Sequence, residues 1–108
     1  MKMVKHRKDI TLQKLSQHTI IEGTLAFPPE LRYTPMGNAV TTFILNTKDK
    51  VINCNIWGEM GEDFVGEYYD AKEPIKFFGS FKQRRYFNDD GEPRQMVYFN
   101  VERIVVEG

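Results

Sequence analysis

The sequence predicts an all-β domain, a small five-stranded antiparallel barrel with one short helix between its third and fourth strands. Runs of alternating apolar and polar residues fill the chain from residue 18 to residue 106, separated by Pro, Gly, Asn and Asp. Gly23 interrupts the first of these runs, and a glycine inside a strand often marks the bulge or bend that a small barrel needs. Hydrophobic residues make up 41% of the 108 residues, which is enough for one compact core.

The strands are expected at residues 18–27, 39–47, 51–57, 75–87 and 94–106. The turns between them contain Pro-x-Gly, Lys-Asp-Lys and Asp-Gly signals, at residues 34–38, 48–50 and 88–93. Residues 58–72 predict a short acidic helix, with Phe64 and Tyr68 one turn apart, and Pro74 ends it. Five strands with a helix between the third and the fourth are the layout of the OB-fold, a partly open Greek-key barrel that often binds oligonucleotides.

Alternation assigns the two faces of the third and fourth strands. The core face is expected to carry Ile52, Cys54, Ile56, Ile75, Phe77 and Phe81. The opposite, solvent-directed face carries Val51, Asn53, Asn55, Trp57, Lys76, Phe78, Ser80, Lys82, Arg84 and Tyr86. Basic residues interleave with aromatic rings on this second face, which favours single-stranded nucleic acid, because rings stack on bases and cations contact phosphates. The alternative is that Phe78 and Trp57 seal an interface between subunits.

The chain has no net charge, because 15 Lys and Arg balance 15 Asp and Glu. This balance argues against simple electrostatic binding of duplex nucleic acid, although it permits binding through a local stripe. Residues 1–17 form a basic arm with a net charge of +4, and residues 59–73 an acidic segment with a net charge of −5. The arm either reaches a phosphate backbone, forms a short helix capped by Asp9, or adds a strand at a subunit edge.

Other classes of protein are disfavoured. Cys54 is the single cysteine, so no intrachain disulfide is expected, and a reducing cytoplasm fits best. The sequence has no apolar run of transmembrane length and no secretory signal. His6 and His18 have no Cys or His partner at ligand spacing, so no metal site is expected. We find no nucleophile–base arrangement, and therefore expect neither an enzyme nor a cofactor.

Three stretches in the first half of the domain resemble the bacterial single-stranded DNA-binding protein family. They are Gly23-Thr24-Leu25, the segment from Pro29-Glu30-Leu31-Arg32-Tyr33 through Pro35-x-Gly37-x-Ala39-Val40, and Phe43-Ile44-Leu45-Asn46-Thr47. Three further pieces follow in the family's order: Ile56-Trp57-Gly58, Gly66-Glu67-Tyr68 and Phe77-Phe78-Gly79-Ser80-Phe81. The resemblance implies an OB-fold that assembles as a dimer or tetramer and wraps single strands over an outer sheet face.

The resemblance also implies roles for individual residues. Trp57 and Tyr86 match stacking aromatics, and Lys82 and Arg84 match outward positions that follow the phosphates. Val51 stands where the family has a further tryptophan, and the loop before it is short. Fewer stacking rings predict modest affinity, or dependence on the basic arm and oligomerisation. No acidic tail like the family's is present, so tail-mediated recruitment of other proteins is not expected.

We therefore expect a basic arm or extra element at residues 1–17 and an OB-fold domain at residues 18–108. The expected function is non-catalytic binding of single-stranded DNA, or of RNA, with little sequence preference, in DNA replication, recombination or repair in the cytoplasm. The binding residues are expected to be Trp57, Phe78, Tyr86, Lys76, Lys82, Arg84, Asn53 and Asn55. The alternative is an OB-fold protein-interaction module with weak or lost nucleic-acid binding.

Overall fold

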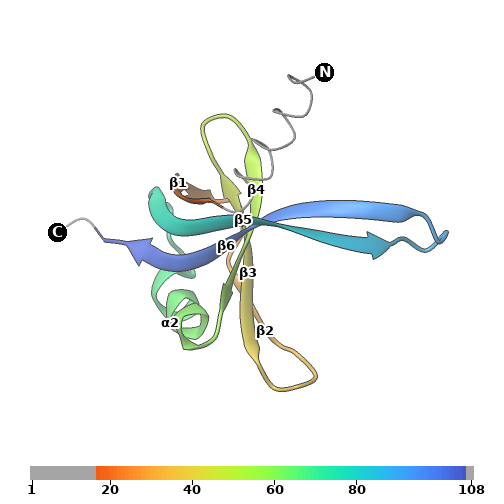
Figure 1. The fold of residues 1–108 in the computed structure, drawn as a ribbon. Helices are drawn as coiled ribbons and strands as arrows, with labels where there is room; N and C mark the ends of the chain where they lie inside the picture. The colour runs from red at the N-terminus through yellow and green to blue at the C-terminus, as the bar shows by residue number, and fades with distance from the viewer. Residues whose placement is uncertain (1–16, 107–108) are drawn as a thin grey trace.

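Six strands and one helix make up residues 17–106, the part of the chain that the computed structural model describes. The elements are β1 His18–Leu25, β2 Glu30–Tyr33, β3 Ala39–Asn46, β4 Val51–Trp57, α2 Glu59–Tyr68, β5 Ile75–Phe87 and β6 Pro93–Val105. The strand order is β1-β5-β6-β4-β3-β2, and an additional pairing of β1 with β3 closes the sheet into a ring (Figure 1). With its helix between β4 and β5, this ring is the predicted OB-fold barrel.

The sequence missed one strand. Residues Glu30–Tyr33 form β2, which pairs antiparallel with β3 and lies outside the closed ring. Four residues between Pro29 and a turn are too few for alternation to be visible. The helix is also shorter than predicted, because it ends at Tyr68. The predicted basic arm falls, apart from Gln17, outside the described residues.

The ring closes where β1 changes partner. Its residues from His18 to Gly23 pair with β5, and its next two residues pair with β3. A Cβ atom on Gly23 would lie 2.2 Å from the backbone oxygen of Asn46. Only glycine therefore lets the two backbones approach closely enough for β1 to join both neighbours. This is the bend predicted from the interrupted strand.

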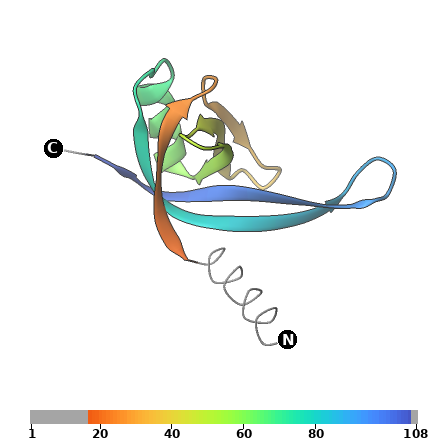
Figure 2. The same cartoon turned by 90° about the horizontal axis from the view of Figure 1, so that it is seen from above.

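A second close approach shapes the long hairpin of β5 and β6. The register shifts between Phe78 and Gly79, because Phe78 faces Arg103 whereas Gly79 faces Val101. A Cβ on Gly79 would lie 2.0 Å from the backbone oxygen of Asn100. A bulge of this kind adds bend and twist to a strand. Beyond it the hairpin extends past the barrel as an arm, which Figure 2 shows from above.

Aromatic rings fill the barrel, and α2 covers one end of it. Phe64 of the helix is fully buried, with its ring centroid 5.1 Å from that of Phe43 and 5.7 Å from that of Phe77. Tyr68, one turn later, packs against Phe64 as its spacing predicted. Because its rings pack into the barrel, the helix closes this end of the core.

Within residues 17–106 no helix is long and apolar enough to cross a membrane.

The tip of the β5–β6 hairpin is held by the predicted turn chemistry. Gly91 has a φ of 78°, and the Asn88 side-chain oxygen accepts hydrogen bonds from the backbone N–H groups of Asp90 (3.0 Å) and Glu92 (2.9 Å). A side-chain oxygen that satisfies two turn amides fixes the loop without help from the barrel. The hairpin is thus ordered to its end although most of its outer half is exposed.

The substitution Gly79→Ala should destabilise the fold. The new methyl group would overlap the Asn100 carbonyl, and relieving such an overlap typically costs about 1–3 kcal/mol. Thermal unfolding should show a fall in melting temperature of at least about 4 °C. Gly66→Ala is the matched control, because a Cβ there meets no atom within 4 Å and alanine favours a helix. Equal melting temperatures for the two variants would contradict the role of Gly79.

The single thiol should be unreactive in the folded protein. Cys54 is 3% exposed, and burial raises the pKa of its thiol from 9.0 to about 12. Ellman's reagent at pH 8 should label it only as fast as the protein unfolds, whereas urea should allow complete labelling at once. Because the folded state holds this proton more tightly, its contribution to the free energy of unfolding should be constant below pH 9 and fall as pH rises toward 12. Rapid labelling without denaturant would contradict this account.

Candidate nucleic-acid interface

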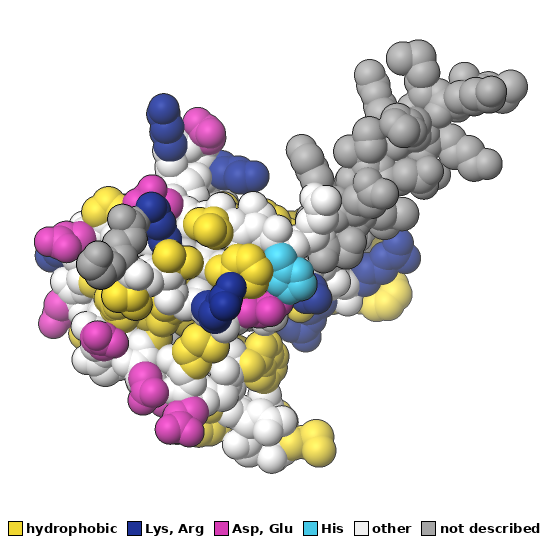
Figure 3. Space-filling view, turned by 60° about the vertical axis from the view of Figure 1, so that its left-hand side comes forward, with side chains coloured by type: hydrophobic (Ala, Val, Ile, Leu, Met, Phe, Trp, Pro, Cys, Tyr) yellow, Lys and Arg dark blue, Asp and Glu magenta, His cyan; other side chains and the backbone are white. Residues whose placement is uncertain are grey.

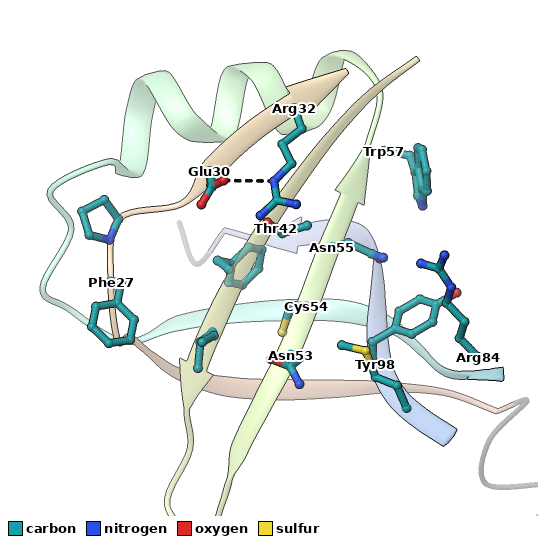
Figure 4. Close-up of a pocket in the computed structure, with 14 residues that line it drawn as sticks. Phe27, Glu30, Arg32, Thr42, Asn53, Cys54, Asn55, Trp57, Arg84 and Tyr98 are labelled. Carbon is teal, nitrogen blue, oxygen red and sulfur yellow. Dashed lines mark hydrogen bonds and ion pairs between the residues drawn. The ribbon is translucent and has the colours of Figure 1, made fainter. Parts of the chain in front are cut away.

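An open cavity of about 570 Å³ runs over the outer face of β2, β3 and β4 and ends against the β5–β6 hairpin (Figure 4). The lining residues come from strands that are far apart in the sequence, so the cavity exists only when the barrel is closed. The cavity is lined by Phe27, Pro28, Glu30, Arg32, Thr42, Phe43, Ile44, Asn53, Cys54, Asn55, Trp57, Arg84, Met96 and Tyr98.

Trp57 stands at the rim of the cavity, at the end of β4. Strand alternation buries Cys54 and Ile56 and turns Trp57 outward, as predicted. Its indole is 48% exposed, and its cross-strand neighbour is Val40, which in turn pairs with Arg32. One broad face of an anchored indole is thus available for stacking, the contact that contributes about 1–3 kcal/mol per base.

The hairpin supplies the opposite wall. Tyr98 and Met96 from β6 and Arg84 from β5 line this wall, and Figure 4 shows the Arg84 guanidinium between Tyr98 and Trp57. Arg84 pairs across the hairpin with Met96, and Lys82 pairs with Tyr98. The hairpin therefore brings a second ring and two cations to the side of the cavity that Trp57 faces.

The floor at the other side is polar. Glu30 and Arg32 of β2 form an ion pair, with the Arg32 Nε donating to the Glu30 Oε1 at 3.0 Å. The Glu30, Thr42 and Asn55 positions form one row across β2, β3 and β4. Within the described chain the side-chain oxygen of Asn55 is buried without a hydrogen-bond partner.

The predicted binding residues divide into two groups. Trp57, Asn53, Asn55 and Arg84 line the cavity, and exposed Lys82 lies beside Tyr98 at its border. The other three residues lie elsewhere on β5. Tyr86 pairs with Arg94 near the hairpin tip, in a separate hollow of about 370 Å³. Phe78 and Lys76 lie before the bulge, where β5 pairs with β1.

Phe78 is enclosed by its neighbours. The His18 ring stacks on it with centroids 5.4 Å apart, and the Arg103 guanidinium lies 4.5 Å from its ring centre. His18 also binds the Glu102 carboxylate through Nε2. Figure 3 shows this face, where the histidine lies against apolar, basic and acidic side chains. The expectation that this face of β5 is solvent-directed is wrong here, because the side chains of His18 and Arg103 cover Phe78 and Ser80 is only 1% exposed.

Ten of the fourteen lining residues were not predicted as binding residues, among them Tyr98, Met96, Arg32 and Glu30. Alternation on β6 does place Tyr98 opposite buried Phe99, so a signal was present. The missing information was the closure that brings β6 beside β4, which pairs Asn55 with Asn100. Arg32 forms an ion pair with Glu30, and both side chains line the cavity.

Tyr33, next to Arg32, points to the other side of β2. Its hydroxyl donates to the Glu62 carboxylate of α2 at 2.8 Å. This hydrogen bond and the charge of Glu62 raise the pKa of the Tyr33 hydroxyl. This hydrogen bond connects β2 to α2. It thereby stabilises the position of β2, the strand on which Glu30 and Arg32 line the cavity.

The chemistry available in the cavity is recognition by rings, cations and amides. Among residues 17–106 no group of three or more His, Cys, Asp or Glu side chains could hold a metal ion. The rings of Trp57 and Tyr98 and the Arg84 guanidinium line a groove that is open to solvent. Such a surface accommodates a flexible polyanion with flat groups.

Comparison with known proteins gives the same family as the sequence motifs. The model of the single-strand binding protein family matches residues 16–106. The single-stranded DNA-binding protein of Mycobacterium tuberculosis H37Rv is 30% identical over 99 residues, covering 78% of this chain and 60% of the relative. That of Bacillus cereus is 32% identical over 89 residues, covering 72% and 52%. This chain thus spans about three-fifths or less of the length of these relatives. Because the family model covers most of the chain, the protein belongs to the single-strand binding protein family.

Proposed function

We propose that this protein binds single-stranded DNA without catalysis, using base stacking and phosphate contacts that require no defined sequence. The observation that carries the proposal is the cavity in which Trp57 and Tyr98 flank Arg84. Two rings around a cation provide stacking surfaces and a phosphate contact within one site. The family and the names of its relatives support the same ligand.

The binding path follows from the charges. Arg84 has no ion-pair partner within the described chain, and exposed Lys82 lies two residues before it on the same strand. Phosphates therefore follow the hairpin, while bases turn toward Trp57 and the polar floor. On the same face of the hairpin as Arg84, the cross-strand pair of Tyr86 and Arg94 extends this path toward the hairpin tip. Phe78 is omitted from the path, because His18 and Arg103 already cover its ring.

The protein is further proposed to act as a homo-oligomer, a dimer or tetramer, in DNA replication, recombination or repair in the cytoplasm. One feature of β1 supports self-association. Among the described residues, the stretch from His18 to Gly23 pairs with β5 on one side and with no strand on the other, and Ile20 on this stretch is 55% exposed. An open strand edge beside an exposed apolar side chain favours pairing with another chain.

Trp57 is the only tryptophan, so its fluorescence reports directly on the cavity. Titration with oligo-dT at low salt should quench the emission, because a stacked base covers the indole. Raising the salt from about 50 to 200 mM should weaken binding, since phosphate contacts release counterions. Trp57→Ala should weaken binding of a labelled oligonucleotide by about 5- to 100-fold. Tyr69→Ala is the matched control, an exposed ring on the helix side of the molecule.

No quenching and no gel shift at low salt would refute DNA binding. The protein would then be an OB-fold interaction module, and a pull-down from lysate would identify its partner. An RNA oligonucleotide of the same length, used as competitor, measures the preference between the two nucleic acids.

Arg84 and Arg85 provide a second test, because they are neighbours on opposite faces of one strand. Arg84 lines the cavity and Arg85 does not. Arg84→Ala should reduce affinity for oligo-dT by about 5- to 30-fold and lower the slope of log K against log salt by about 0.7, the value for one phosphate of a single strand. Arg85→Ala should stay within about twofold of the wild type, as measured by fluorescence anisotropy. Equal losses in both variants would remove the cavity from the binding site.

A further inference from the structure

Phe27 is a further exposed ring in the cavity, and it was not among the predicted binding residues. It is 66% exposed, more than Trp57, and it lines the cavity beside Pro28. A single exposed apolar residue is ordinary and by itself indicates nothing. Phe27 differs because it borders the groove whose opposite end holds Trp57, as Figure 4 shows, with the Glu30–Arg32 ion pair between the two rings.

The chain holds this ring in place without covering it. Before the ring, the backbone N–H of Ala26 donates to the carbonyl of Ile44 on β3 at 2.9 Å, and after it Pro29 is buried directly before β2. A proline after Phe27 restricts its backbone to extended conformations, and Pro28 itself has a fixed φ. A ring on a short, anchored and stiff loop loses little conformational freedom when a ligand stacks on it.

The strand register gives the separation of the two rings along the cavity. Trp57 pairs with Val40, whereas Phe27 follows the residue that is hydrogen-bonded to Ile44. Val40 and Ile44 lie four residues apart on β3, which corresponds to about 13 Å. The bases of one DNA strand rise about 3.4 Å each when stacked, so roughly four nucleotides cover this distance, and fewer do so in a stretched strand. One strand can therefore reach both rings within the site size of a single OB-fold.

The surface near Phe27 has no net charge. Glu30 and Arg32 form an ion pair there, and the neighbouring lining residues Thr42 and Ile44 are uncharged. A nucleotide at this end of the cavity therefore gains little from attraction of its phosphate. Stacking on the exposed ring is the contact that this end offers.

We propose that Phe27 stacks a base of the bound strand, a few nucleotides away from the base on Trp57, and forms the far end of the DNA path. The inference rests on the proposed function and adds a second subsite, which accepts any base because every base has a flat face. Bound DNA then runs from the hairpin past Trp57 and across β3 to the loop before β2. The alternative occupant of this ring is a second subunit.

Phe27→Ala should weaken binding of a labelled oligo-dT of about ten nucleotides by about 5- to 30-fold, as measured by fluorescence anisotropy. The slope of log K against log salt should stay as in the wild type, because no phosphate contact is removed. Phe87→Ala is the matched control, since Phe87 is 74% exposed and lies outside the cavity, on the face of the hairpin that carries Arg85. Its affinity should stay within about twofold of the wild type.

An indole at position 27 reports on this end of the cavity alone. In the double variant Trp57→Phe with Phe27→Trp, saturating oligo-dT should quench the emission, because a stacked base covers the new indole. In Trp57→Phe with Phe87→Trp, the emission should change little. Sedimentation velocity should give Phe27→Ala the oligomeric mass of the wild type, and circular dichroism should show that the exposed substitutions keep the fold.

Wild-type affinity in Phe27→Ala, or an unquenched indole at position 27, would overturn the second subsite, while quenching of Trp57 in the wild type would leave DNA binding intact. A lower oligomeric mass in Phe27→Ala would also overturn it and would assign the ring to a contact between subunits. A wild-type protein that shows neither quenching nor a gel shift would instead refute the proposed function, and the second subsite with it.

Discussion

The barrel depends on two places where backbones approach more closely than any side chain permits. At Gly23, β1 leaves β5 and joins β3 beside the Asn46 carbonyl, and at Gly79, β5 bends beside the Asn100 carbonyl. Without the first approach the ring would stay open along β1 and expose the aromatic core. Without the second, β5 would continue straight and the hairpin would leave in another direction. Steric contacts at two residues thus determine the closure of the whole sheet.

The same closure builds the cavity. Strands β4 and β6 meet in parallel over only two residue pairs, Cys54 with Phe99 and Asn55 with Asn100. This short contact brings the hairpin against the outer face of β4, so that Tyr98 and Arg84 face Trp57. Binding groups that are far apart in the sequence therefore meet because the core closes, and damage to the core also damages the site.

The sequence predicted the features that depend on residues close together in the chain, and it missed those that depend on closure of the sheet into a barrel. Alternation identified the faces of β4, and hence Trp57, and the glycine inside the first strand identified the bend at Gly23. Alternation alone could not show that side chains from β1 and β6 cover Phe78, or that β6 carries Tyr98 to the cavity. The face on which a side chain lies follows from alternation along its own strand, whereas its exposure depends on the side chains that neighbouring strands bring beside it.

The distribution of charge explains how a chain without net charge can present a site for a polyanion. Exposed charges act over about 8–10 Å at physiological salt, so a distant carboxylate hardly weakens a local cation. The acidic residues of α2 do not line the cavity, and Glu62 is hydrogen-bonded to Tyr33 on the other side of β2. Glu30 is the exception, and its pairing with Arg32 weakens the negative potential at its end of the cavity. Net charge therefore says little about such a site, because the arrangement of a few residues determines the electrostatic potential inside the cavity.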